Sequence, residues 1–294
     1  MERKNTLALR IAGLDLVLDA RDSSLNLAAP FIYEKFLGVH LPFKPALGTE
    51  VMSLTLSVSN ECFGVEKSWG VPVCLTKIWE LWLDENGKHI FISPRQSPPK
   101  KVQIDPDFRT GEILGDFSLF KDQAIYPLSS IDIRIMVNWL AGFGDLILHA
   151  AGVSVKGQGY CFIGEAGKGK STLASALVKH DTVTVLGEDQ VILRYLDGQF
   201  WIFGTPWHEH VEMCSPIGVP LKKIFFLDRE MEQVTKPVFP SEGLTRILQT
   251  AFVPYYLPDK MQMIIEHLSL LGKEIPFIRL KYKLGSDILP FILY

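Results

Sequence analysis

The sequence predicts a mixed α/β protein, with a β-rich segment over residues 1–125 and an α/β (α+β) segment over residues 126–294. Two observations support this expectation. Short apolar runs separated by turn residues dominate the first segment, which is the usual pattern of strands. In the second segment, an apolar run, a glycine-rich turn and a helix-forming run follow one another around residue 164, and more strand-like and helix-like runs come after them.

Within residues 1–125, the apolar pattern predicts strands in residues 7–18 and 51–58 and a short helix over residues 31–37. Residues 78–83 alternate and are followed by Asn86-Gly87, a pair that tolerates positive φ, so a hairpin with residues 89–92 is expected. Residues 97–101, with two prolines and two lysines, are expected to form a surface connection. The aromatic side chains are interpreted as core, and the sequence indicates no role for this segment.

The second segment opens with a helix expected to end near Leu140, with Ser129 or Ser130 as its cap, and the domain boundary is placed just before it. A strand over residues 146–155, a turn over 156–159 and a strand over 160–163 follow. Because the turn is short, the strand that enters the glycine-rich loop is expected to have an antiparallel neighbour, which makes the predicted sheet mixed.

The rest of the chain is expected to alternate strands and helices. An Asp197-Gly198 turn lies between two of the predicted strands, and Gly272 is expected to end the second helix. The predicted strands cover residues 183–186, 191–193, 200–203, 224–227 and 275–280, and the predicted helices cover residues 241–251 and 259–271.

The composition is that of a globular protein with a sizeable core: 47% of the 294 residues are hydrophobic and 21% are charged. A net charge of −3 gives no electrostatic support to a nucleic-acid partner. The four cysteines are widely spaced and are interpreted as buried thiols in a reducing cytosol. We expect a cytoplasmic protein without a signal peptide or membrane span, because charged and polar residues interrupt the apolar runs.

Residues 164–171 read Gly-Glu-Ala-Gly-Lys-Gly-Lys-Ser and match G-x-x-x-x-G-K-[ST], a loop that wraps the phosphates of a nucleotide. Its glycines let successive N–H groups turn toward a phosphate, and the following helix adds positive potential. Lys170 would contact the β and γ phosphates, and Ser171 would hold Mg²⁺. Lys168 is interpreted as a solvated charge. The predicted cofactor-binding residues are Gly164, Glu165, Ala166, Gly167, Lys168, Gly169, Lys170, Ser171 and Thr172.

His149 on a strand, the hairpin, the loop and the acidic pair Glu188-Asp189 together resemble the catalytic domain of the HPr kinase/phosphorylase family, and more closely the shorter kinases related to it. The likeness covers roughly residues 127–230. It implies the mixed sheet of the HPr kinase and PEP carboxykinase type. It also implies catalytic roles for His149, Lys170, Glu188 and Asp189, with the acidic pair supplying Mg²⁺ binding and the base that activates a serine hydroxyl. Glu188 stands where the family has an aspartate.

The stretch from His208 to Glu212 contains further candidates for metal binding. Glu212 could stand for the acidic residue of the family's glycine-rich signature, so the resemblance implies Ser171, Asp189 and Glu212 as metal ligands. If extended, His208, His210 and Glu212 would face one side, which is a less favoured pattern for a transition metal. A loop near the acceptor is the preferred interpretation of this stretch.

The sequence thus predicts an ATP- and Mg²⁺-dependent kinase that transfers a phosphoryl group to a hydroxyl, with serine of a protein or peptide as the favoured acceptor. The acceptor could instead be a small molecule, and the donor could be pyrophosphate. An alternative is a nucleotide-binding sensor without transfer. A transport-type ATPase is disfavoured, since the Leu-Ser-Gly-Gly signature is absent. Homo-oligomerisation is left open.

Overall fold

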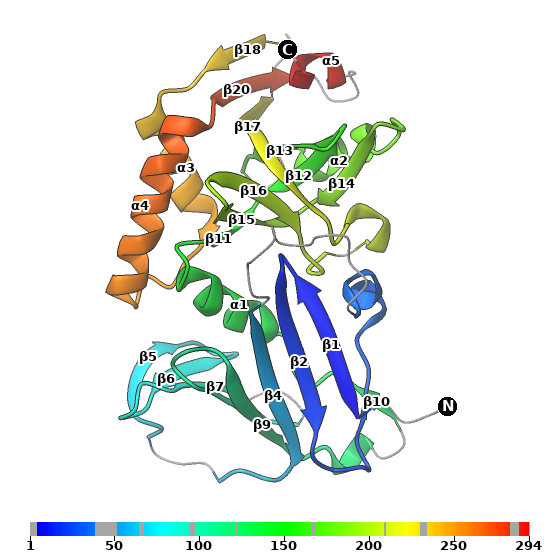
Figure 1. Ribbon diagram of the computed structural model, residues 1–294, viewed down its shortest axis with the longest axis vertical. Helices are drawn as coiled ribbons and strands as arrows, with labels where there is room; N and C mark the ends of the chain where they lie inside the picture. The colour runs from blue at the N-terminus through cyan, green and yellow to red at the C-terminus, as the bar shows by residue number, and fades with distance from the viewer. Residues whose placement is uncertain are drawn as a thin grey trace. The chain divides into compact units, whose positions relative to one another are not determined.

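The computed structural model describes residues 5–38, 52–64, 68–94, 98–120, 123–165, 169–208, 210–229, 234–282 and 288–293 (Figure 1). Contacts between Cα atoms divide the chain into two compact units, Met1–Met136 and Val137–Tyr294. The division falls inside helix α1 (Asp132–Ala141), later in the chain than the boundary expected at residue 125.

The first unit is built on an eight-stranded sheet with the order β1-β2-β4-β9-β8-β7-β6-β5. Two short strands, β3 and β10, pair with each other, and η1 and η2 are 3₁₀ turns. The elements are β1 (Thr6–Ile11), β2 (Leu14–Ala20), β3 (Asn26–Leu27), η1 (Phe31–Phe36), β4 (Ser53–Asn60), β5 (Val71–Leu75), β6 (Glu80–Leu83), β7 (His89–Ser93), β8 (Lys100–Ile104), β9 (Thr110–Gly115), η2 (Ser118–Phe120) and β10 (Ala124–Ile125).

Turn chemistry explains the hairpins of this sheet. The predicted 7–18 strand is two strands, β1 and β2, because Ala12 and Gly13 both take positive φ and reverse the chain. The hairpin expected at Asn86-Gly87 is confirmed: β6 and β7 pair antiparallel, and Gly87 has φ 76°.

The expectation of a surface connection at residues 97–101 is wrong at its C-terminal end; Ser97 itself lies outside the described residues. Lys100 begins β8, which pairs with β7 on one side and β9 on the other. Alternate residues of a strand share a face. Lys100 is therefore buried on the same face as Val102 and Ile104.

The second unit contains a ten-stranded mixed sheet. Eight strands follow one another in the order β14-β12-β13-β17-β16-β15-β11-β19, β20 also pairs with β17, and β18 pairs with β20. β13 has the expected antiparallel neighbour, β12, and a parallel one, β17. The strands are β11 (Leu146–His149), β12 (Ala151–Val155), β13 (Gln158–Ile163), β14 (Val183–Gly187), β15 (Gln190–Leu196), β16 (Gln199–Gly204), β17 (Gly218–Arg229), β18 (Val234–Pro237), β19 (Ala251–Phe252) and β20 (Phe277–Tyr282).

Helices cover both faces of this sheet. On one face, Ile224 and Phe226 of β17 share a hydrophobic cluster with residues of α3 and α4. On the other, Phe225 and Leu227 pack with residues of α2 and α5. The alternation along β17 therefore places a helical layer on each side, an α/β arrangement that can be followed in Figure 1. The helical elements are α2 (Lys170–Leu177), η3 (Val211–Met213), α3 (Pro240–Thr250), α4 (Pro258–Glu274) and α5 (Leu289–Leu293).

Two sequence expectations for this unit need correction. The strand expected over residues 146–155 is interrupted at Ala150: β11 pairs with β15 and β19, whereas β12 pairs with β13 and β14. Gly272 does not end the last long helix but lies inside α4. A Cβ at Gly272 would lie 3.2 Å from Leu244 of α3, so the glycine serves close helix packing instead of a cap.

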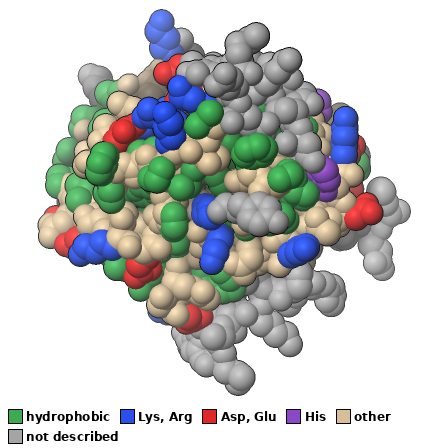
Figure 2. Space-filling model, turned by 90° about the horizontal axis from the view of Figure 1, so that it is seen from above, with side chains coloured by type: hydrophobic (Ala, Val, Ile, Leu, Met, Phe, Trp, Pro, Cys, Tyr) green, Lys and Arg blue, Asp and Glu red, His purple; other side chains and the backbone are tan. Residues whose placement is uncertain are grey.

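The four cysteines differ in their exposure. Cys161 and Cys214 are buried thiols, but Cys62 is exposed, so the interpretation of all four as buried is wrong. No described helix combines the length and the apolar character needed to cross a membrane. On the face shown in Figure 2, basic and acidic side chains are interspersed with polar and apolar ones.

Candidate functional site

The break between β11 and β12 places His149 beside Asp189. β11 runs antiparallel to β15, with His149 opposite Gln190, and the N–H of Ala150 donates to the carbonyl of Asp189. As a result, Nδ1 of His149 lies 3.1 Å from Oδ1 of Asp189. The two side chains are partly exposed, at 35% and 44%. The sequence placed both residues in the site but gave no reason for this direct contact.

The electrostatic environment lowers the pKa of His149. Burial is the largest cause, the positive charge of Lys170 acts in the same direction, and Asp189 opposes them. The imidazole is therefore mainly neutral at pH 7. A carboxylate only accepts hydrogen bonds, so Asp189 favours the neutral tautomer with the hydrogen on Nδ1, the nitrogen that faces it, and the lone pair on Nε2.

Lys170 is the first residue of α2 and is buried, with 7% of its surface exposed. Its ammonium donates a 2.8 Å hydrogen bond to the carbonyl of Gly164, which directly follows β13. Burial lowers the pKa of Lys170, and the charge of Asp189 opposes this. The side chain thus reaches back across the loop to its first residue.

Backbone geometry at the start of α2 depends on Gly169. Its φ of 97° lies in the left-handed region that other residues avoid. Its carbonyl accepts from the N–H of Leu173 and, at 3.1 Å, from the hydroxyl of Tyr282 on β20. Ala166, Gly167 and Lys168 lie outside the described residues, so their predicted phosphate contacts stay predictions.

The two acidic residues of the predicted pair have different environments. They occupy the bend between β14 and β15, where Glu188 is 6% exposed and Asp189 is 44% exposed. The charge of Asp189 acts on His149, Lys170 and His208. Of the pair, Asp189 is therefore the carboxylate presented to solvent and to the basic groups of the site.

The predicted metal ligands are brought together only in part. Ser171 and Thr172 are exposed in the first turn of α2, and Glu212 is exposed in η3. Among the described residues, no hydrogen bond or ion pair joins Glu212 to Asp189, and no group of three or more His, Cys, Asp or Glu could hold a metal. The 3₁₀ helix η3 spans Val211–Met213, so this stretch is not extended as the pattern required, and His208, His210 and Glu212 do not gather as a metal-binding group in the described structure. Mg²⁺ can still be held by one carboxylate, a hydroxyl and the phosphates of a substrate, so Asp189 and Ser171 are suitable donors for it.

His208 contacts the acidic turn in a way that the sequence did not indicate. Its Nε2 lies 3.1 Å from Oγ1 of Thr205, which donates to the carbonyl of Gln190. A Cβ at Gly187 would lie 2.7 Å from the imidazole, so the ring packs directly on that glycine. Burial lowers the pKa of His208 to about 4 despite the opposing charge of Asp189. In the sequence, the glycine at position 187 was the feature that could have indicated this close approach of His208.

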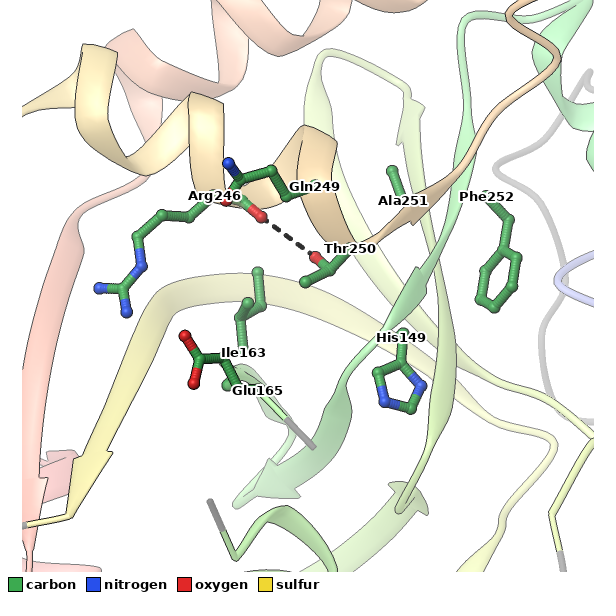
Figure 3. A pocket seen from close by; sticks show the side chains of 9 residues that line it. His149, Ile163, Glu165, Arg246, Gln249, Thr250, Ala251 and Phe252 are labelled. Carbon is green, nitrogen blue, oxygen red and sulfur yellow. Dashed lines mark hydrogen bonds between the residues drawn. The ribbon is translucent and has the colours of Figure 1, made fainter. Parts of the chain in front are cut away.

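A pocket of about 460 Å³ opens beside this group (Figure 3). His149 of β11 and Glu165 after β13 line one part of it, and the end of α3 with β19 lines the other. Gln249 and Thr250 supply polar groups there, and Phe252 supplies an aromatic one. Arg246 extends away from His149 and pairs with Asp228. The α3 contribution comes from residues distant in sequence, and no motif marked it.

Comparisons with known proteins give a distant structural relation. No protein-family model and no curated protein matches the chain. Among solved structures, it is similar to the Hpr(Ser) kinase/phosphatase from Coxiella burnetii at 13% sequence identity, over 50% of this chain and 90% of that chain, with a TM-score of 0.28. Its function has to be inferred from its own residues.

Proposed function

We propose that this chain is a phosphotransferase that uses ATP and Mg²⁺ to phosphorylate a hydroxyl, with serine of a protein or peptide as the favoured acceptor. One observation carries the proposal: Lys170, Asp189 and His149 gather beside a strand–loop–helix that matches the phosphate-binding pattern. Phosphoryl transfer needs a held donor, neutralised charge and an oriented acceptor. Those three groups can meet these needs.

The donor side is assigned to the loop and to Lys170. The amide groups at the start of α2 and the ammonium of Lys170 would bind the β and γ phosphates. The ammonium exchanges its hydrogen bond to Gly164 for the phosphate. Mg²⁺, held by Ser171 and Asp189, would supply neutralisation of the charge that develops on the transferred group.

The acceptor side is assigned to Asp189 and His149. The acceptor oxygen would attack the γ phosphorus, while the bond from that phosphorus to the β–γ bridging oxygen breaks and ADP leaves. The O–H bond of the acceptor breaks, and its proton passes to the lone pair on Nε2 of His149. Asp189, bound at Nδ1, orients the ring and stabilises the cation that forms. The lowered pKa of His149 keeps the imidazole in the form that accepts a proton at neutral pH.

The pocket of about 460 Å³ beside His149 is the proposed acceptor site. Its volume lies within the range of about 300–1,000 Å³ that is typical of ligand pockets. It can take a single side chain of a protein, or a small molecule with a hydroxyl, next to His149.

One observation favours a nucleotide-binding sensor as the second candidate. Since Glu188 is buried, Asp189 is the exposed carboxylate of the pair. It would have to bind Mg²⁺ and also orient His149 toward the acceptor. A sensor needs only the phosphate-binding loop and Lys170.

Transfer of label from γ-labelled ATP into a cell extract separates the two. A kinase labels an acceptor, and Asp189→Asn abolishes labelling but keeps binding of the nucleotide through the loop and Lys170, whereas Lys170→Ala loses binding. Asp181→Asn and Lys179→Ala, which change exposed residues near α2, serve as controls and should act as wild type. Label that stays on bound nucleotide with every variant and every extract contradicts transfer and supports the sensor.

A further inference from the structure

The first unit contains a second pocket, of about 410 Å³, beside the N-terminal end of β8. Aromatic side chains form much of its wall, with Phe117, Phe120 and Tyr126 contributed by the segment that leads into α1. Lys100, the first residue of β8, also lines it. The volume is near the lower end of the range for small-molecule pockets, about 300–1,000 Å³.

Lys100 is a cation in an unusual position, because only 7% of its surface is exposed. Lysine is rarely buried unless its ammonium is paired. Within the described parts of the chain, no hydrogen bond and no ion pair within 4.0 Å is made by this ammonium. Burial lowers the pKa of Lys100, and the charge of Asp132 opposes the effect.

Asp132 is not a direct partner of Lys100: no hydrogen bond or ion pair joins these two described residues, and Asp132 accepts hydrogen bonds from other donors. The hydroxyls of Tyr33 and Tyr126 both donate to Oδ2, the latter at 3.1 Å, and the N–H of Ile133 donates to Oδ1. Asp132 therefore favours the charged form of Lys100 from a distance, and no acceptor among the described residues takes up the three ammonium donors.

We propose that this pocket binds a carboxylate carried next to an aromatic ring, with the carboxylate on Lys100 and the ring among Phe117, Phe120 and Tyr126. An ammonium only donates hydrogen bonds, so its matching ligand is an acceptor, and a carboxylate adds the opposite charge. Aromatic walls favour an aromatic ring over an aliphatic chain through edge and offset contacts. The free acid and the end of a peptide chain share this chemistry.

The experiment titrates the ¹⁵N-labelled full-length chain with phenylacetate and, separately, with phenylacetamide. The two probes differ only in the charged group. A charged hydrogen bond contributes about 1.5–3 kcal/mol, so phenylacetate should bind about tenfold or more tightly than the amide. Saturable shifts are expected at Phe117 and Gln123 of the pocket. Equal affinity of the two probes, or no saturable shift at these positions, overturns the proposal without any variant.

Two variants then assign the preference to one side chain. Lys100→Met should reduce the affinity for phenylacetate to that for the amide, whereas Lys101→Met should keep the preference. Lys101 is the matched control because it follows Lys100 on β8 and stacks instead on Trp69, 4.5 Å from the ring centre. A preference that survives Lys100→Met contradicts the proposal.

A third probe, N-acetyl-glycyl-phenylalanine, carries the same two groups at a chain end. Tighter binding than phenylacetate assigns the pocket to a peptide terminus. Weaker binding assigns it to a free acid.

Discussion

Acid should destabilise this protein through His208, a histidine held neutral in the folded state. The hydroxyl of Thr205 donates its hydrogen to the carbonyl of Gln190, so its oxygen accepts from Nε2–H of His208. Nδ1 is buried and, among the described residues, has no hydrogen-bond partner. Protonation would therefore bury a charge and an N–H without an acceptor, which is why burial lowers the pKa from 6.5 to about 4.

The sign and size of the effect follow from proton linkage. A lowered pKa means that the unfolded chain binds the proton more tightly, so the stability from His208 is fully present above pH 6.5 and is lost as the pH falls toward 4. The whole difference corresponds to about 3 kcal/mol, and about 2 kcal/mol of it is lost between pH 7 and pH 5.

Urea unfolding at pH 7 and pH 5 measures this loss. His208→Gln keeps a donor to Thr205 but cannot titrate, so this variant should lose about 2 kcal/mol less than wild type between the two pH values. His210→Gln, at an exposed histidine two residues later, should behave as wild type. An equal loss in wild type and His208→Gln refutes the reasoning, as does an imidazole of His208 that titrates near 6.5 in NMR spectra.

Three further predictions concern the second unit. Asp145→Asn should reduce the free energy of unfolding in urea by about 3–5 kcal/mol, because the buried guanidinium of Arg194, 2.7 Å from the carboxylate, loses its counter-charge. An Asp145→Leu/Arg194→Leu double variant that is no more stable than Asp145→Asn contradicts this account. Gly169→Ala should lower the free energy of unfolding by about 1–2 kcal/mol, since φ is 97°, and should weaken ATP binding measured by calorimetry. A variant in which neither the stability nor the ATP affinity changes rules out the left-handed conformation at this position. Asp189→Asn should lower the pKa of His149 in an NMR titration, because Asp189 is the group that raises it, and an unchanged value argues against their contact.

The sequence predicted what depends on local chemistry. The order of β13, the glycine turn and α2 followed from residues that are neighbours in the chain, as did the turn at Asp197-Gly198, where both residues take positive φ. The position of Gly169 in the left-handed region has the same origin, because only glycine adopts it without strain.

Features that depend on distant partners were not predictable in this way. The apolar run from 146 to 155 is continuous in sequence, and it divides at Ala150 only because its two halves pair with different strands. Lys100 follows two prolines and was expected at the surface, but the flanking strands bury its face of β8. His208 packs on Gly187, which lies about 20 residues earlier in the chain, and no repeating pattern of the sequence predicts that contact.

The acidic pair shows how such a distant contact changes the interpretation of a motif. From the sequence, Glu188 and Asp189 were both candidates for catalysis, Asp189 alone of the two was named as a metal ligand, and Glu188 in place of a family aspartate weakened the case for transfer. In the structure the two differ in environment: Asp189 contacts His149 and influences Lys170, whereas Glu188 is buried. The difference from the pattern of the family that the sequence resembles therefore falls on the buried carboxylate. The proposed chemistry depends on Asp189 and His149, and the replacement at 188 does not by itself argue against a kinase.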